Sequence, residues 1–158
     1  MKRLSPFVLL LLAAGCGDKA ILPFLGKWQG QFEVQRMQIS GTESDRKRES
    51  LKGYVQVYAD KHKFKMRMEG EQEAVDLTGI WSIKGRQITL QFSEVVVDDM
   101  GGEQFRDPNR KFISPLDLRA AYGKPIVLNL SADKQHLDGL TMTMGGLTGR
   151  HVYVKDSF

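Results

Sequence analysis

Apolar and polar residues alternate in short runs along most of this chain. The first run places Trp28, Phe32 and Val34 on one side, with charged or amide side chains between them. A period of two residues is typical of a β-strand that buries one face and exposes the other. Because no long stretch has helical periodicity, the pattern predicts an all-β domain with eight strands. The seven later runs lie at residues 52–58, 63–68, 75–83, 88–97, 126–130, 140–144 and 150–155.

Short turn signals connect most of these runs. Lys84-Gly85 and Gly145-Gly146 are two-residue hairpin signals, and such turns join antiparallel neighbours. The apolar side changes parity after Ser93, which predicts a β-bulge near Glu94. The runs therefore predict an antiparallel meander, in which each strand pairs with the next one along the chain.

One long insertion interrupts the meander between the fifth and sixth strands, from Asp98 to Lys124. Ser114 is a typical N-cap, Pro115 suits the first helical position, and Gly123 is a stop signal. We expect one short helix here, with Tyr122 available to pack on the sheet.

The N-terminal residues have the pattern of a secretory signal. Lys2 and Arg3 precede an apolar run at residues 7–14, which is too short to span a bilayer as a helix. Cys16 is the only cysteine in the chain, and small residues precede it. The segment resembles the lipobox of bacterial lipoproteins, in which such a cysteine is lipidated and becomes the new N-terminus. The alternative is an ordinary secretory signal with an incidental cysteine.

This resemblance implies a particular organisation and location. Residues 1–15 would be the signal peptide, residues 16–23 the lipidated cysteine and its tether, and residues 24–158 the folded domain. Acyl chains would anchor the domain to a membrane of the cell envelope. In the enteric form of the family, an aspartate directly after the cysteine favours the inner membrane. Gly17 occupies that position here, which favours the periplasmic face of the outer membrane.

Charge and cysteine content argue against a nucleic-acid-binding protein and against a disulfide-stabilised domain. The net charge is +4, and Lys2 and Arg3 belong to the signal, so the remaining charge is too small to indicate nucleic-acid binding. With Cys16 lipidated, no disulfide is possible within one chain. The domain must therefore be stabilised by packing alone.

The domain pattern resembles the lipocalin-like (calycin) barrels. Gly26-Lys27-Trp28 opens the first strand, Thr78-Gly79-Ile80-Trp81 repeats that spacing, and Arg150 lies on the last strand. The resemblance implies that Trp28 lies across one end of a closed barrel with Arg150 packed on its ring. A guanidinium over an indole contributes roughly 1 kcal/mol to such a closure. Because Arg150 shares a strand face with Val152 and Val154, we expect it to point inward.

The expected interior is rich in methionine, which suits either an irregular core or a cavity for variable apolar shapes. The first hypothesis is a barrel that binds a small hydrophobic, lipid-like ligand. The alternative is a filled barrel that acts as a structural or protein-interaction lipoprotein, or as an inhibitor of an envelope enzyme, through the 98–124 insertion. The candidate lining residues are Phe64, Met66, Met68, Trp81, Phe92, Met142 and Met144.

No motif in the chain indicates catalysis, a metal or another cofactor. The three histidines, His62, His136 and His151, are scattered and lack the spacing of metal ligands, and His151 is expected on the outer face. Asp98, Asp99 and Glu103 flank a glycine pair in the insertion, which a loose calcium site would also do, but their spacing fits no EF-hand loop and favours a plain acidic loop. We therefore expect a binding or interaction protein rather than an enzyme.

Overall fold

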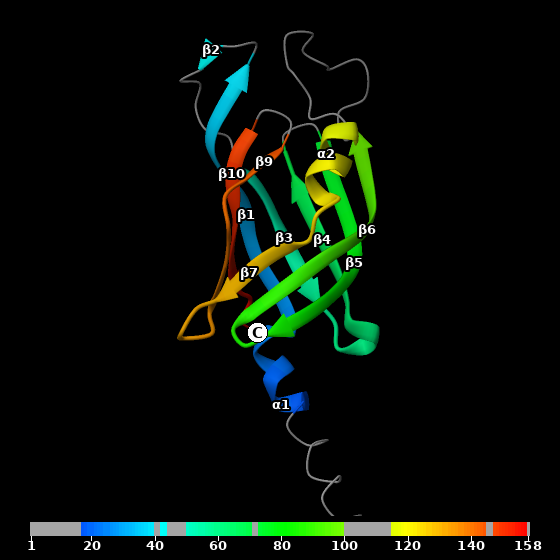
Figure 1. The fold of residues 1–158 in the computed structure, drawn as a ribbon, viewed down its shortest axis with the longest axis vertical. Helices are drawn as coiled ribbons and strands as arrows, with labels where there is room; N and C mark the ends of the chain where they lie inside the picture. Colours follow the sequence, from blue (N-terminus) through cyan, green and yellow to red (C-terminus); the bar gives the residue numbers. More distant parts are fainter. Residues whose placement is uncertain are drawn as a thin grey trace, which may run out of the picture.

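The computed structural model describes residues 17–39, 42–43, 50–70, 73–99, 115–144 and 147–157 (Figure 1). Two short helices precede the first strand, and α2 interrupts the strands later in the chain. The helical segments are α1 (Gly17–Ile21), η2 (Leu22–Phe24), η3 (Asp60–His62) and α2 (Pro115–Tyr122). The strands are β1 (Gly26–Ile39), β2 (Thr42–Glu43), β3 (Leu51–Val57), β4 (Lys63–Glu69), β5 (Glu73–Lys84), β6 (Gln87–Asp99), β7 (Ile126–Leu130), β8 (His136–Gly139), β9 (Met142–Met144) and β10 (Leu147–Lys155).

Eight of these strands form a closed antiparallel barrel. They follow the order β1-β3-β4-β5-β6-β7-β8-β10, and β10 pairs with β1 to complete the circle. The short strands β2 and β9 extend β1 and β10 respectively. This arrangement confirms the predicted all-β meander barrel, with one helix between its fifth and sixth strands. Closure matters because a barrel leaves no strand edge along its wall for pairing with another chain.

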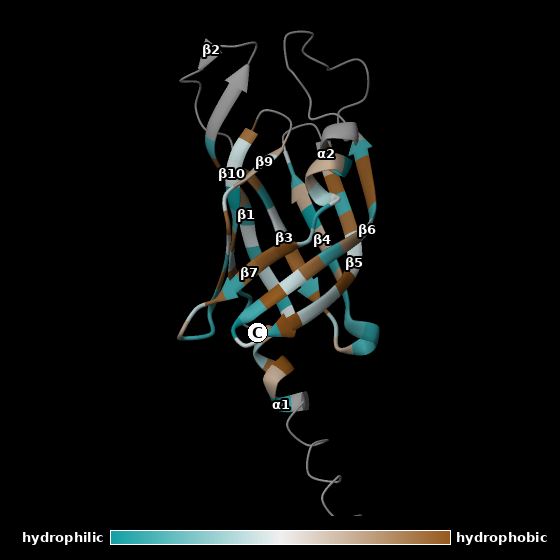
Figure 2. Ribbon diagram, in the orientation of Figure 1, coloured by the Kyte–Doolittle hydropathy of each residue, from teal (hydrophilic) through white to brown (hydrophobic). Residues whose placement is uncertain are grey.

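The inward faces of most strands agree with the alternation in the sequence. Val55, Met66, Leu77 and Leu128 are fully buried, and they belong to β3, β4, β5 and β7. Apolar and polar residues alternate along the strands in Figure 2. The predicted bulge is also confirmed, because Thr78 pairs with Glu94 and the next pair skips Ser93. The change of parity after Ser93 therefore has the expected physical cause.

The seventh barrel strand lies earlier in the chain than the sequence indicated. Its barrel segment is β8, where Leu137 is the buried residue, and Leu140 is 68% exposed. The chain leaves the sheet at residues 140–141 and returns as β9. One inward leucine between two polar neighbours gives only a weak strand signal, whereas Met142 and Met144 gave a stronger one.

The last strand has the opposite parity to the one expected. His151 and Tyr153 are buried, whereas Val154 is 50% exposed. The prediction that Arg150 points inward with its aliphatic neighbours was therefore wrong. Valine is favoured on either face of a strand, so it did not identify the buried side.

Paired glycines let neighbouring side chains pack closely inside the wall. Gly30 of β1 lies opposite Gly53 of β3. A Cβ atom on Gly30 would overlap the carbonyl oxygen of Val152, and its next neighbour would be the ring of Tyr153. Tyr153 is Gly30's partner across the closing seam. The glycine therefore leaves room for a large aromatic ring at this level of the barrel.

Candidate functional site

The indole of Trp28 lies at the end of the barrel next to α1, but its cationic partner is Lys155 rather than Arg150. Trp28 is fully buried, and its Nε1 donates to the carbonyl of Phe24 at 2.9 Å. Lys155 Nζ lies 5.2 Å from the indole centroid and donates to the carbonyl of Pro23 at 2.9 Å. The seam therefore does have a cation–π contact, made by the last residue of β10.

Arg150 lies away from this closure. The strand register pairs Trp28 with Lys155 and places Arg150 opposite Glu33. Arg150 Nε donates to Glu33 Oε2 at 3.0 Å in a half-exposed ion pair. The prediction that Trp28 and Arg150 touch was wrong because residues five positions apart on an antiparallel strand lie well separated along the seam.

Trp81 is anchored in the same way as Trp28. It is 3% exposed, and its Nε1 donates to the carbonyl of Tyr58 at 2.9 Å. The ring of His62 meets the indole edge-on, with 4.6 Å between ring centroids. The repeated glycine–tryptophan spacing thus corresponds to two indoles at the same end of the barrel. Each donates a hydrogen bond to a main-chain carbonyl outside the strands.

The candidate lining residues lie in the barrel core. Phe64, Met66, Met68, Trp81 and Met144 are between 0 and 3% exposed, and Phe92 and Met142 are half-buried at its margin. This low exposure indicates that the five side chains pack against their neighbours in the core. They fill the barrel together with Leu118 and Tyr122 of α2, which are each 1% exposed.

A buried polar cluster lies within this packed core, and sequence reasoning missed it. We call it the histidine cluster: His151, Tyr122, Tyr153 and Met68. His151 Nδ1 lies 2.9 Å from Tyr153 Oη, and its Nε2 lies 3.2 Å from Tyr122 Oη. Tyr122 Oη in turn donates to Met68 Sδ at 3.4 Å. The cluster joins α2 to β4 and β10.

One protonation pattern satisfies every donor in the histidine cluster. If His151 carries its proton on Nε2, that N–H donates to Tyr122 Oη and the bare Nδ1 accepts from the Tyr153 hydroxyl. Tyr122 then donates its own hydroxyl hydrogen to Met68. The other neutral tautomer would leave the Tyr153 hydroxyl without an acceptor among these groups. The network therefore assigns the Nε2–H tautomer.

Burial sets the charge state of the histidine cluster. Desolvation lowers the pKa of His151 from 6.5 to about 3, so the imidazole is neutral near pH 7. The same desolvation raises the pKa of both tyrosines, which keeps Tyr122 and Tyr153 protonated. Phe32 meets the imidazole edge-on at 5.1 Å. With all three groups neutral and sealed from water, the cluster positions α2 and offers no group to a substrate.

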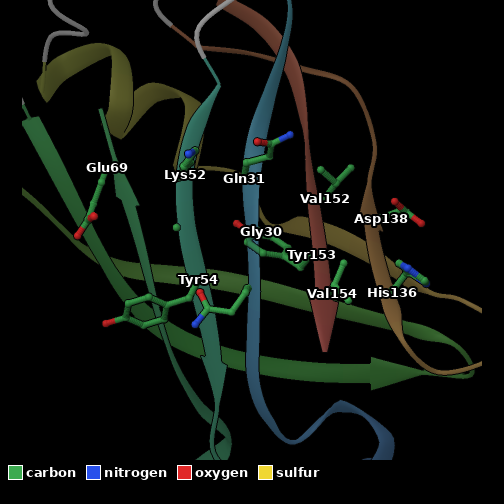
Figure 3. A pocket seen from close by; sticks show the side chains of 12 residues that line it. Gly30, Gln31, Lys52, Tyr54, Glu69, His136, Asp138, Val152, Tyr153 and Val154 are labelled. Carbon is green, nitrogen blue, oxygen red and sulfur yellow. The ribbon is translucent and has the colours of Figure 1, made fainter. Parts of the chain in front are cut away.

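The remaining candidate is a groove on the outer wall along the β1–β10 seam (Figure 3). It has a volume of about 530 Å³ and is lined by side chains of β1, β3, β4, β8 and β10. Its charged lining residues are Lys52, Glu69 and Asp138, so charges of both signs border the groove. The strands beneath it are paired on both sides, which leaves side chains as the only groups available for binding.

The other predicted chemistry falls partly outside the described residues. Cys16 and Glu103 lie outside them, as does most of the 98–124 insertion. Within the described ranges, no group of three or more histidine, cysteine, aspartate or glutamate residues is arranged to hold a metal ion. The helices of that part of the chain are all too short or too polar to cross a bilayer.

In comparisons with known proteins, no protein family, curated protein or solved structure matches the chain.

Proposed function

We propose that the protein is a lipid-anchored lipoprotein of the bacterial cell envelope whose lipocalin-like barrel is filled and acts as an interaction module. The observation that carries this proposal is the packed interior, because the methionine and aromatic side chains that would line a ligand site occupy that space themselves. A drug-sized ligand requires a cavity of roughly 300–1,000 Å³. The barrel therefore supports the structural alternative better than the carrier.

The 98–124 insertion is the part proposed to meet a partner. It leaves the barrel at the end of β6 and returns through α2, and both lie at the opposite end of the barrel from α1 (Figure 1). An anchor at Cys16 would place the membrane beyond α1, so the described ends of the insertion, at the end of β6 and in α2, would lie away from the lipid. The histidine cluster holds the returning helix in a fixed position.

Site-specific photo-crosslinking in the native host tests this role. A photoreactive side chain at Asp98, at the start of the insertion, should give one specific adduct, and the same group at Asp138 on the outer wall should not. Adducts at both positions, or at neither, would contradict an interaction through the insertion.

The anchor has its own test. Replacement Cys16→Ser removes the thiol that would carry the lipid, so the protein should move from the membrane pellet to the soluble fraction. Retention of the variant in the pellet after a carbonate wash would contradict the lipoprotein assignment.

A small hydrophobic ligand stays a second candidate because apolar residues are half-buried at the end of the barrel away from α1. Val95, Val97, Met142 and Leu147 form this margin. Native mass spectrometry of protein purified from its own host would reveal a bound lipid. Protein that is empty and takes up no fluorescent fatty acid would exclude this candidate.

A further inference from the structure

The end of the barrel next to α1 has an excess of exposed basic residues. Strand directions place three loops there: 58–62 between β3 and β4, 85–86 between β5 and β6, and 131–135 between β7 and β8. The start of β1 and the end of β10 lie at the same end. The exposed basic residues of these loops, their flanking strand ends and α1 are Lys19, Lys61, Lys63, Lys84, Arg86 and Lys134.

Acidic residues at this end only partly balance the basic ones. Asp60, Asp133 and Asp156 are the described acidic residues of the loops and the C-terminal segment, and Asp18 lies in α1. Asp133 is already engaged by the hydroxyl of Ser131 and by His136. Among described residues, Lys61, Lys84 and Lys134 form no ion pair. No acidic side chain of the described ranges therefore neutralises these three lysines, which suits the attraction of an external anion.

An apolar side chain lies at the same end. Leu22 of η2 is 60% exposed, and it follows directly on α1. Phe24, two residues later, is buried in the barrel. An exposed leucine beside lysines is the combination that binds a lipid surface, where apolar insertion and charge attraction add.

The sequence places the proposed anchor directly before this end. Only Gly17–Phe24 separates Cys16 from the barrel, and these residues form α1 and η2. Five residues of α-helix and three of 3₁₀-helix rise by about 14 Å. A lipid on Cys16 would hold the basic loops close to the headgroups.

We propose that this basic end docks on anionic phospholipid headgroups of the membrane that holds the anchor, so that the barrel stands with its α1 end on the membrane. The inference rests on the proposed lipid anchor. Each lysine or arginine near an anionic surface strengthens attraction about fivefold. The opposite end of the barrel, with the end of β6 and α2, would then face the periplasm.

The test measures which end of the lipidated protein lies near the bilayer. Single cysteines replace Ser157 at the α1 end or Thr143 at the opposite end, and each carries a fluorophore. The protein is reconstituted in vesicles of phosphatidylcholine alone or with phosphatidylglycerol, and energy transfer to a headgroup acceptor is recorded. We expect transfer from position 157 to increase with phosphatidylglycerol and to fall at high salt, while position 143 changes little.

Charge reversal provides the matched comparison. The triple variant K61E/K84E/K134E should lower the ratio of docked to undocked protein by more than about a hundredfold, because the loss of three lysines alone accounts for that factor and the three glutamates add repulsion. The triple variant K52E/R119E/K124E changes net charge equally at exposed positions away from this end, and it should retain docking.

The outcomes separate the two proposals. If the protein stays on both kinds of vesicle but shows equal energy transfer in each, the docking surface alone is overturned. Identical behaviour of the two triple variants would have the same meaning. Either result would favour an acidic protein partner for the basic end. Protein lost from both kinds of vesicle would overturn the anchor, and the docking surface with it.

Discussion

At the scale of single residues, His151 makes folding stability depend on pH. Its pKa is about 3 in the folded protein and near 6.5 when exposed, so the unfolded chain binds one more proton between these values. The contribution of neutral His151 is complete above pH 6.5 and is lost as the pH falls toward 3. The free energy of unfolding should decrease by up to about 1.4 kcal/mol per pH unit in that window.

Urea unfolding at pH 7, 5.5 and 4.5 measures this dependence. The variant His151→Gln removes the titrating group. It should reduce the slope of the unfolding free energy against pH by the contribution of one proton, although it lowers stability at pH 7. Equal slopes for the natural protein and His151→Gln would show that another group is responsible.

A second residue-scale prediction compares the two cations of β10. Lys155→Met removes both the contact over Trp28 and the hydrogen bond to Pro23, and should cost about 1–2 kcal/mol. Arg150→Met removes only a half-exposed ion pair, which is worth about 0–1 kcal/mol. Thermal unfolding of both variants decides the matter. A larger loss for Arg150→Met would contradict the assignment of Lys155 as the cation that stabilises the seam.

Most strands could be predicted from the sequence because their buried faces are uniformly apolar. In β4, Phe64, Met66 and Met68 alternate with basic residues, so the pattern indicated a strand and identified its buried face. The last strand lacks such contrast, since valines occupy its outer face and the buried face holds His151 and Tyr153. A polar ring enters the core only when its partners are present, and Tyr122 comes from α2, far away in the chain.

At the scale of secondary-structure elements, the pairing of Gly30 with Gly53 makes the barrel wall sensitive to one added methyl group. Gly30→Ala would push a Cβ into the carbonyl of Val152 and the ring of Tyr153. We expect a loss of about 1–3 kcal/mol, the usual cost of overpacking. Equilibrium unfolding in guanidinium chloride measures it. The control is Ala59→Gly, at the N-cap of η3, and a smaller loss for Gly30→Ala than for this control would argue against the close packing.

The same packing explains what sequence patterns could reveal about the candidate site. The tryptophans were identified because a glycine lies two residues before each one. In the structure, both indoles donate hydrogen bonds to main-chain carbonyls outside the strands. The histidine cluster had no comparable spacing. The one available signal was that a small residue, Gly30, lies opposite a large one, Tyr153, across the seam. That pairing can be recognised only when the strand register is known.

At the scale of the whole molecule, a filled barrel and a carrier differ in how they respond to the loss of one core side chain. Met66 is fully buried in the middle of β4. Met66→Ala should cost about 2–5 kcal/mol, because lost apolar contact and a residual void both destabilise the fold. An engineered apolar cavity of this kind stays dry and binds benzene. The variant should therefore bind benzene, while the natural protein should not.

Chemical-shift titration with benzene gives the measurement, and Met142→Ala gives the control, since Met142 is half-buried at the barrel margin and its loss opens no enclosed space. Binding by Met66→Ala alone would show that the natural side chains fill the barrel. Binding of benzene by the natural protein at similar affinity would instead reveal space that already exists inside the wall. That result would favour the carrier and remove the main reason for proposing that the protein acts as an interaction module.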